Sequence, residues 1–326
     1  MEHRHLGRTG LRVSRLGLGT LTWGRNTGER DAADQLKTFW NAGGSLVDTA
    51  DVYADGGAEY LLGRLIEDLV PRSDLVIATK AGSVPDPDRR FDTSRGHLLS
   101  ALDASLQRLG TDHVDLWQVH AFDPGTPLDE TLQALDIAVS SGRARYVGVS
   151  NFCGWQLAKA ATWQLAGSGR TALASTQMEY SLLQRGVERE VLPAALDLGL
   201  GLLPSSPLGR GVLTGKYRGG TPQDSRGGSE DMAPFVEPYL DETAALIVDA
   251  VAIAADGLAV SPLHVALAWV RDRPGVAAPL LGARNAQQLT AALSVEALTL
   301  PDEIRQALDD VSAPLHRYPD HDWSTL

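Results

Sequence analysis

Short hydrophobic runs alternate with longer amphipathic stretches along most of this chain. The runs at residues 46–49 and 75–80 are rich in Leu, Val, Ile and Ala and predict buried strands. The stretch at 93–109 repeats apolar residues at helical spacing and is followed by Gly110, which predicts a helix and its end. Strands that alternate with helices in this way pair in parallel and are covered by those helices.

The whole pattern predicts eight strands, separated by one or more helices. The strands are expected at residues 16–19, 46–49, 75–80, 114–120, 146–150, 174–177, 201–203 and 276–281. The helices are expected at 31–41, 58–68, 93–109, 127–141, 154–166, 187–198, 239–256, 262–272, 285–293 and 301–311.

Eight such units favour one architecture of the α/β class. They fit a closed (β/α)8 barrel, of the TIM type, better than an open doubly wound sheet. An amino-terminal hairpin is expected at 4–13 and a long irregular loop at 209–236, after the seventh strand, before the C-terminal helices. No linker or shift in composition divides the chain, so residues 1–326 are expected to form a single domain.

Composition and charge narrow the class of protein. The chain has 326 residues, is 43% hydrophobic and carries a net charge of -12, which argues against nucleic acid as a partner. It has no uninterrupted apolar run of about 18 residues and begins without the apolar run of a signal peptide. We therefore expect a cytoplasmic protein with no membrane partner. The sequence does not determine its oligomeric state. The one cysteine, Cys153, excludes a disulfide framework and is expected to be buried.

Four polar side chains of different chemistry fall at the ends of three consecutive predicted strands. Asp48 ends the second strand and is followed by Tyr53, Lys80 ends the third strand, and His120 ends the fourth. Barrel enzymes carry their active groups at the carboxyl ends of the strands, so we expect these residues at one mouth. The next three strands also end in polar residues, namely Ser150, Asn151, Gln177, Ser205 and Ser206.

These four residues suggest a particular chemistry. A buried ammonium needs a counter-ion, and Asp48 is the expected partner of Lys80. An ammonium beside a phenol favours the phenolate, so we expect the pKa of Tyr53 to be lowered. Such a phenol can give a proton to a carbonyl oxygen, and His120 can donate to the same oxygen. With no evident nucleophile, the set favours hydride transfer to a carbonyl over hydrolysis.

Each of these residues also has an ordinary structural interpretation. An acid after a strand often caps a helix, a lysine can extend to solvent, and a histidine or tyrosine can simply pack. Their joint occurrence at corresponding strand ends favours function. Asp48 and His120 have no third ligand at metal spacing, so we expect no metal.

Five motifs resemble those of the aldo-keto reductases, over nearly the full length of the chain. They are DTADVY (48–53), ATK (78–80), DLWQVH (115–120), VGVSNF (147–152) and SPLGRGVLTGKY (206–217). The resemblance implies that Tyr53 is the general acid, that Lys80 and Asp48 tune it, and that His120 orients the carbonyl. It also implies a nicotinamide cofactor, usually NADP(H) and less often NAD(H), and no metal.

By the same resemblance the cofactor lies extended across the barrel mouth. The nicotinamide end would contact Gly19, Thr20, Leu21, Asp48, Ser150, Asn151 and Gln177. The pyrophosphate would contact Ser206, Pro207, Leu208, Gly209, Gly211 and Lys216. Gly282 and Arg284 open a predicted helix, and a guanidinium fork suits a 2′-phosphate. Arg226 is a second candidate for that phosphate or else a solvated loop charge, and Gln288 would lie at the adenine end.

The chain departs from the family pattern at two places. The family usually has an aromatic ring before Ser-Pro-Leu, stacked on the nicotinamide, where this chain has Ser205. At the adenine end the family often has Glu and Asn where this chain has Ala291 and Ala292. The first departure implies a loss of cofactor affinity or of a defined ring face, and the second implies that adenosine is held more weakly or by other residues.

Three functions compete at this stage. The first is an NADP(H)-dependent carbonyl reductase or alcohol dehydrogenase, whose partner is a small carbonyl or alcohol. The second is a nicotinamide-binding sensor or partner subunit with little turnover, like the potassium-channel β-subunits that share the barrel. The third, a barrel lyase, needs a metal or a Schiff-base lysine, and Asp48 would keep Lys80 protonated.

Three aromatic residues are candidates for the rim of the substrate pocket. They are Trp23, Tyr53 and Phe122, with packing an equal alternative for Trp23. Trp117 is a weaker candidate, because it can face the helices instead. The tail at 316–326 is expected either to cover the site or to be frayed.

Overall fold

Eight parallel strands form one sheet in the computed structural model, which describes residues 1–66, 68–86, 88–230 and 232–314. The strand order is β10-β3-β4-β5-β6-β7-β8-β9. Their bounds are β3 (Gly17–Gly19), β4 (Leu46–Asp48), β5 (Val76–Ala81), β6 (Val114–Val119), β7 (Ala144–Ser150), β8 (Leu173–Glu179), β9 (Gly201–Ser205) and β10 (Leu280–Leu281). The expectation for the tail at 316–326 lies outside the described residues.

The sheet closes into a barrel between its first and last strands. Leu202 of β9 forms a parallel bridge with Val276, and the N–H of Ala277 donates to the carbonyl of Leu202 at 2.8 Å. The predicted (β/α)8 barrel is therefore confirmed. The last strand is shorter than the expected 276–281, because Pro279 has no N–H to give to a strand ladder.

A small antiparallel hairpin closes the amino-terminal end of the barrel. Its strands are β1 (His3–His5) and β2 (Arg12–Ser14), as expected from the sequence. Leu6 and Val13 are fully buried in one cluster with Leu46, the first residue of β4. The opposite end of the barrel, where the strands end, is left for the loops that follow them.

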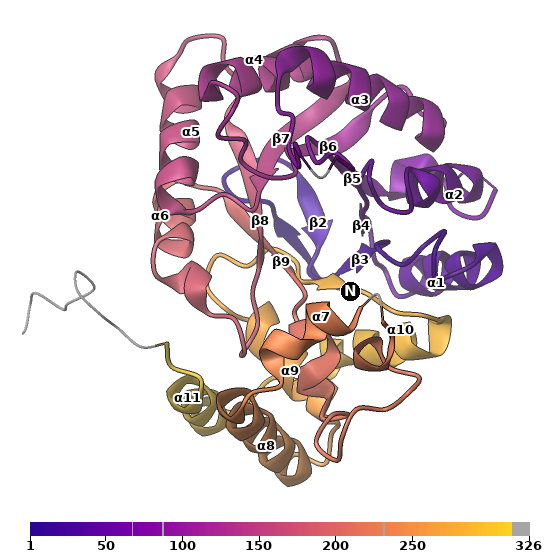
Figure 1. The fold of residues 1–326 in the computed structure, drawn as a ribbon, viewed down its shortest axis with the longest axis vertical. Coiled ribbons are helices and arrows are strands. Elements are labelled where there is room, and N and C mark those ends of the chain that lie inside the picture. Colours follow the sequence, from indigo (N-terminus) through magenta and orange to yellow (C-terminus); the bar gives the residue numbers. More distant parts are fainter. Residues whose placement is uncertain (67, 87, 231, 315–326) are drawn as a thin grey trace, which may run out of the picture.

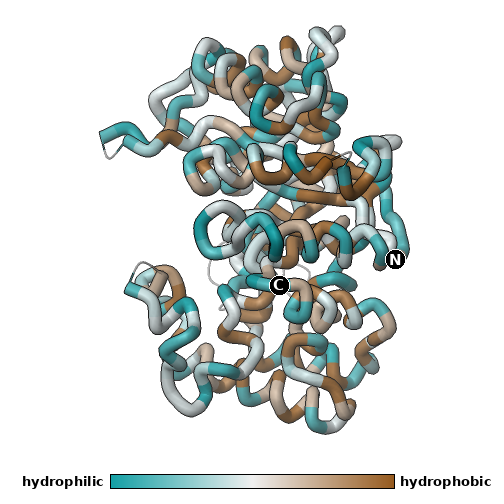
Figure 2. The backbone as a smooth tube through the Cα atoms, turned by 90° about the vertical axis from the view of Figure 1, so that its right-hand side faces the viewer, coloured by the Kyte–Doolittle hydropathy of each residue, from teal (hydrophilic) through white to brown (hydrophobic). Residues whose placement is uncertain are grey.

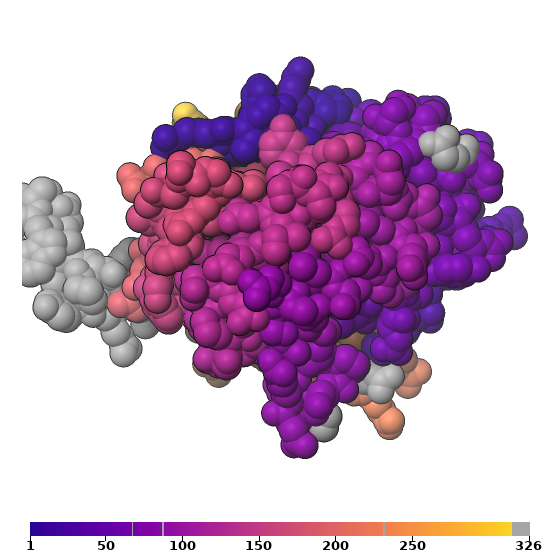
Figure 3. Space-filling model, turned by 90° about the horizontal axis from the view of Figure 1, so that it is seen from above, coloured from indigo at the N-terminus to yellow at the C-terminus, as the bar shows by residue number. Residues whose placement is uncertain are grey.

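Eight helices follow the strands around the barrel (Figure 1). They are α1 (Glu29–Asn41), α2 (Gly57–Leu65), α3 (Arg95–Leu109), α4 (Leu128–Ser140), α5 (Gly154–Ala166), α6 (Val191–Leu198), α9 (Pro262–Arg271) and α10 (Ala286–Leu293). Helix α8 (Glu242–Gly257) and helix α11 (Asp302–Val311) lie side by side at one end of the molecule. The view from above shows the surface made by α3, α4 and α5, with the indigo hairpin at its edge (Figure 3).

The helix boundaries follow local signals. Helix α3 begins after Ser94, whose hydroxyl accepts from the N–H of His97, and ends at Gly110 in the left-handed region at φ 64°. The long segment after β9 holds only short pieces, namely η3 (Gly209–Thr214), η4 (Arg226–Gly228), α7 (Ala233–Val236) and η5 (Glu237–Tyr239). It is largely irregular, as its glycines and prolines predict.

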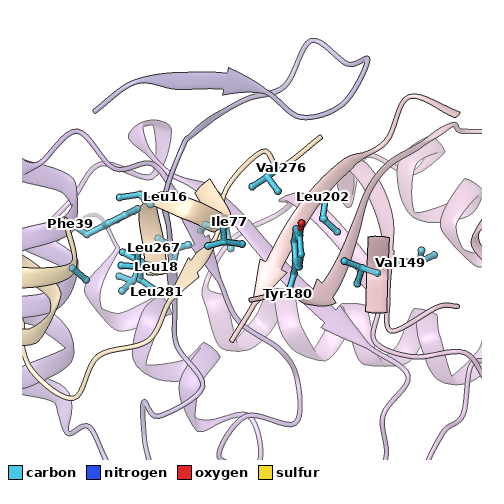
Figure 4. Close-up of a cluster of buried hydrophobic side chains, with 14 of the residues drawn as sticks. Leu16, Leu18, Phe39, Ile77, Val149, Tyr180, Leu202, Leu267, Val276 and Leu281 are labelled. Atoms are coloured by element: carbon cyan, nitrogen blue, oxygen red, sulfur yellow. The ribbon is translucent and has the colours of Figure 1, made fainter. Parts of the chain in front are cut away.

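The main hydrophobic core lies between the strands and the helices. Leu18, Ile77 and Leu281 of the barrel strands are part of it together with Phe39 of α1 and Leu267 of α9 (Figure 4). The hydropathy of the chain follows this layering, with hydrophobic and hydrophilic stretches alternating along the outer helices (Figure 2). No single described helix is long and apolar enough to cross a membrane; α8 and α9 qualify only together, as a pair bent by 102°.

Gly148 of β7 gives a test of how tightly the barrel interior is packed. A Cβ at this position would overlap the Ser175 hydroxyl and lie 2.8 Å from the Ser175 carbonyl oxygen on β8. We expect Gly148→Ala to lower the free energy of unfolding by about 1–3 kcal/mol, measured by urea unfolding.

The matched control is Gly96→Ala, in α3, where a Cβ meets nothing within 4 Å. We expect that change to be neutral or stabilising by up to about 1 kcal/mol. Equal stability of both variants would show that β7 and β8 can separate freely.

Candidate active site

A buried ion pair lies at the carboxyl ends of β4 and β5. The Lys80 ammonium donates to Asp48 Oδ2 at 2.7 Å and to the Thr49 carbonyl at 2.6 Å. Lys80 is fully buried and Asp48 is nearly so. The other carboxylate oxygen, Asp48 Oδ1, accepts from Gln177 Nε2 of β8 at 2.8 Å. Both charges are thus paired and hydrogen-bonded, as burial requires.

Tyr53 lies directly beside this pair. Its ring centroid is 5.1 Å from Lys80 Nζ, and its ring meets that of His120 edge-on, with the centroids 6.0 Å apart. The loop turns sharply after it, since Ala54, Asp55 and Gly56 all adopt left-handed backbone, with φ of 50°, 55° and 86°. A non-glycine residue in that region costs about 1 kcal/mol or more, so the loop stores strain at this point.

Burial controls the protonation of these groups. Burial raises the pKa of Tyr53, and the neighbouring Lys80 opposes this shift only in part. The net direction is opposite to the lowering expected from the sequence, because desolvation outweighs the ammonium. Burial lowers the pKa of Lys80, but Asp48 and Tyr53 outweigh it and leave that pKa raised. Burial, with help from Lys80, lowers the pKa of His120 to about 3, so its ring is neutral near pH 7.

The other predicted nicotinamide contacts surround this centre. Thr20 donates to the Asp48 carbonyl from its N–H and its hydroxyl, next to Gly19 at the end of β3, and Leu21 is 45% exposed. Ser150 donates to the Gln177 carbonyl at 3.1 Å. Asn151, in left-handed backbone at φ 56°, donates to the carbonyl of His120. These residues bring the ends of β3, β4, β6, β7 and β8 into one mouth.

A cluster of three cations lies beside the loop after β9. Lys216, Arg226 and Arg284 are close enough to act on one another, and within the described parts of the chain none forms an ion pair with a carboxylate. Burial lowers the pKa of Lys216 and of Arg226, and the neighbouring cations push both in the same direction. Lys216 and Arg284 are exposed and Arg226 is half-buried, so the cluster can be reached by an anion from solvent.

Glycines make room for this cation cluster. A Cβ at Gly211 would lie 3.1 Å from the ammonium of Lys216, and one at Gly282 would lie 3.7 Å from Arg226 Nη2. Gly209, Arg210 and Gly211 are successive left-handed residues, at φ of 53°, 58° and 97°. Ser206 is also left-handed at φ 49°, and Ser205, Pro207 and Leu208 complete this turn.

Helix α10 begins beside the cluster. Arg284 donates to the Asp224 carbonyl at 2.7 Å, and its N–H donates to Gln288 Oε1 at 3.0 Å. Asn285 caps the helix by accepting from the Gln288 N–H. The two residues predicted for the 2′-phosphate and the one predicted for the adenine end therefore lie in one region.

Comparison with known proteins gives the family. The sequence profile of the Aldo/keto reductase family matches residues 15–313. The chain belongs to this family. It is therefore an oxidoreductase of the aldo/keto reductase type, as its motifs predicted.

Relatives in several organisms match nearly the whole chain. It is 37% identical to the uncharacterized oxidoreductase YrpG of Bacillus subtilis (strain 168), over 95% of this chain and 96% of that protein. It is 36% identical to a probable voltage-gated potassium channel subunit beta of Oryza sativa subsp. japonica, over 93% and 94%. It is 31% identical to the versiconal hemiacetal acetate reductase of Aspergillus parasiticus, over 98% and 99%.

The aromatic candidates for the substrate rim differ in their surroundings. Trp23 is fully buried and its indole donates to Gln35 of α1, an arrangement that suits packing, so we do not propose it as a substrate contact. Phe122 is partly exposed two residues after His120 and meets Phe152 and Trp155 edge-on. Trp117, the weaker candidate, is fully buried in the core between strands and helices.

Several polar contacts near the site were not anticipated from the sequence. Glu59 of α2 is fully buried and pairs with Arg108 of α3, and Asp51 lies close to both. Glu59 falls among the buried apolar positions of α2, which is the signal that could have revealed it. Arg210 binds Glu179 through two hydrogen bonds, of 3.0 and 2.7 Å, and so ties the long loop to β8.

Two expectations concern metals and the cysteine. No group of three or more His, Cys, Asp or Glu side chains suited to a metal occurs within the described ranges. Cys153 is exposed, so the expectation that it is buried is wrong. It precedes α5, and its N–H donates to Gln156 Oε1, which is a helix-capping position rather than a core one.

The Asp48–Lys80 pair can be tested through stability. We expect Asp48→Asn to lower the free energy of unfolding by about 3–5 kcal/mol, because it leaves a buried ammonium without its counter-ion. Urea unfolding measures the loss. The double variant Asp48→Asn/Lys80→Met removes both charges and should recover most of it. A single variant as stable as the wild type would show that Lys80 does not depend on Asp48.

Proposed function

We propose that this protein is an NADP(H)-dependent oxidoreductase that interconverts small aldehydes or ketones with alcohols. The observation that carries the proposal is the buried Asp48–Lys80 pair with Tyr53 and His120 against it at one barrel mouth. When bound, the nicotinamide supplies or accepts the hydride. The remaining steps fall to the side chains of this chain.

Proton transfer is assigned to Tyr53. Its phenol would donate to the carbonyl oxygen as negative charge develops there, while Lys80 stabilises the phenolate that is left. The ammonium stays charged because Asp48 holds it. The raised pKa of Tyr53 keeps the phenol protonated near pH 7, which is the form that can donate to a carbonyl oxygen.

His120 is assigned to orienting the carbonyl. Its pKa of about 3 means that the ring is neutral and can donate one N–H without bringing a second positive charge beside Lys80. Its Nδ1 is buried and has no partner within the described part of the chain. Phe122 is proposed to form part of the apolar wall of the substrate pocket.

The cofactor assignment rests on the cation cluster. Lys216, Arg226 and Arg284 offer positive charge without a counter-ion, and Gly211 leaves space for Lys216 that a larger residue would fill. A 2′-phosphate supplies the negative charge that such a cluster lacks, so we propose NADP(H) over NAD(H). Ser205 stands where the family usually has an aromatic residue, so this chain has no ring at that position to stack on the nicotinamide.

A second candidate function is a nicotinamide-binding subunit with little turnover. It is favoured by the 36% identity to a protein named as a probable potassium channel subunit beta. Turnover separates the two candidates, because the reductase requires multiple cycles of NADPH consumption with a carbonyl substrate.

Tyr53→Phe tests the reductase directly. We expect kcat for NADPH-dependent reduction of aldehydes and ketones to fall at least about 100-fold, because the proton donor is lost. The loss of NADPH absorbance at about 340 nm measures the rate. Tyr60→Phe, at an exposed tyrosine of α2, is the matched control and should keep the wild-type rate. Full activity in the Tyr53 variant would sink the assignment.

Arg226→Ala tests the cofactor preference. We expect NADPH to bind about 10- to 100-fold more weakly, since a charge-assisted contact is lost, while NADH binding stays unchanged. Fluorescence titration with each nucleotide measures both constants, and Arg284→Ala should act in the same way. Arg218→Ala is the control, because Arg218 already pairs with Asp249. Equal weakening for both nucleotides would remove these arginines from the 2′-phosphate.

A further inference from the structure

A second group of charges lies behind the loop that carries Tyr53. Glu59 of α2 is fully buried and accepts from Arg108 of α3 and from Thr79, the residue before Lys80. The N–H of Asp51 donates to the Lys80 carbonyl at 3.1 Å. The backbone of Asp51 is therefore held at the end of β5, two residues before Tyr53 in the chain.

The side chain of Arg108 is built into this arrangement. A Cβ at Gly56 would lie 2.8 Å from Arg108 Cδ, so the glycine both permits the left-handed turn and leaves room for the arginine. Arg108 gives two donors to Glu59 and one to Ser105. Asp51 receives no such ion pair, and its Oδ1 is buried without a partner in the described chain.

The balance of charges in this region shows which acid lacks a partner cation. Lys80 balances Asp48, and Arg108 balances Glu59. An ionised Asp51 would leave one uncompensated negative charge on a half-buried side chain whose Oδ1 is shielded from water, whereas a protonated Asp51 leaves the set neutral. Withdrawing a charged carboxylate oxygen from water without a partner is unfavourable in free energy. Protonation removes that charge and so favours the neutral form of Asp51.

We propose that Asp51 is a positioning residue whose protonation state sets how readily Tyr53 gives up its proton. This inference rests on the proposed function and adds to it a control of Tyr53 by pH. When Asp51 is neutral, Lys80 acts on Tyr53 without opposition from a second carboxylate. When Asp51 is ionised, its negative charge holds the proton on Tyr53 and slows carbonyl reduction.

The electrostatics of the site agree with this direction. Burial, reinforced by Glu59, raises the pKa of Asp51 to about 7, with Arg108 and Lys80 opposing it. The Asp51 charge in turn contributes to the raised pKa of Tyr53. The charged groups that face Asp51 are Glu59 from α2, Arg108 from α3 and Lys80 from β5. His120, with a pKa of about 3, does not titrate in the same range.

The kinetic experiment compares pH profiles of Asp51→Asn and the wild type. The probes are NADPH and benzaldehyde, which has no titrating group. We expect the ratio of kcat/KM, variant over wild type, to rise about 3- to 10-fold between about pH 6 and pH 8, because only the wild type gains the charge. Taking the ratio cancels any titration of the nucleotide itself.

Asp55→Asn is the matched control for this profile. Asp55 is exposed in the same loop, and its left-handed backbone is one that asparagine tolerates. The ratio of kcat/KM for Asp55→Asn over the wild type should not change with pH. A purely structural role of Asp51 would lower the rate equally at every pH, so a flat ratio for Asp51→Asn would overturn the inference.

Stability supplies a readout that does not depend on turnover. The folded pKa of Asp51 is raised, so its contribution to stability is present at low pH and is lost as pH rises through about 7. The Tm of Asp51→Asn relative to the wild type should therefore increase between about pH 5 and pH 8. A constant difference would show that Asp51 does not titrate there and would overturn the inference.

Together the measurements separate the two proposals. A wild type that consumes NADPH, and loses this activity in Tyr53→Phe, supports the proposed function whatever Asp51 does. A flat Asp51→Asn ratio in that active enzyme overturns only the role of Asp51. A wild type without turnover, tested on the same substrates, overturns the reductase and with it the control of Tyr53.

Discussion

The ion pair between Asp48 and Lys80 is the interaction on which the mouth of this barrel depends. Two opposite charges, 2.7 Å apart, are withdrawn from water at the ends of adjacent strands. Such burial is tolerable only when the remaining donors and acceptors are satisfied. Gln177 from β8 and the Thr49 carbonyl meet that need, so the pair ties strands on both sides of the barrel to one point.

The surrounding groups differ in whether their charges balance. The Asp48–Lys80 pair and the Glu59–Arg108 pair are each neutral, and they are fixed parts of the structure. Asp51 adds a negative charge that has no partner cation, and Lys216, Arg226 and Arg284 add positive charge without a carboxylate. An unbalanced buried acid can be neutralised by a proton, and an unbalanced cation cluster by an anion. These imbalances are the basis of the two proposals, proton uptake at Asp51 and anion binding at the cation cluster.

The sequence predicted the elements and the strand-end residues because both follow from local pattern. Alternating runs determine the barrel, and the barrel brings Asp48, Lys80 and His120 to one end. The predicted direction of the Tyr53 pKa shift was wrong, because that direction depends on the balance of burial and charge in three dimensions. Glu59 and Arg108 lie on different helices, so no sequence spacing joins them. Cys153 was misplaced for a simpler reason, because a small residue at a helix start can face solvent.

The overall charge of -12 and the cation cluster are compatible because they act over different distances. Salt screens the field of the whole protein within about 8–10 Å, whereas charges that lie close together are screened less. Arg226 and Arg284 push the pKa of Lys216 down, and Arg284 pushes that of Arg226 down, so the cations of this cluster repel one another. A bound phosphate would offset that repulsion locally. The same charges that would select the proposed NADP(H) would then also stabilise the loop that surrounds it.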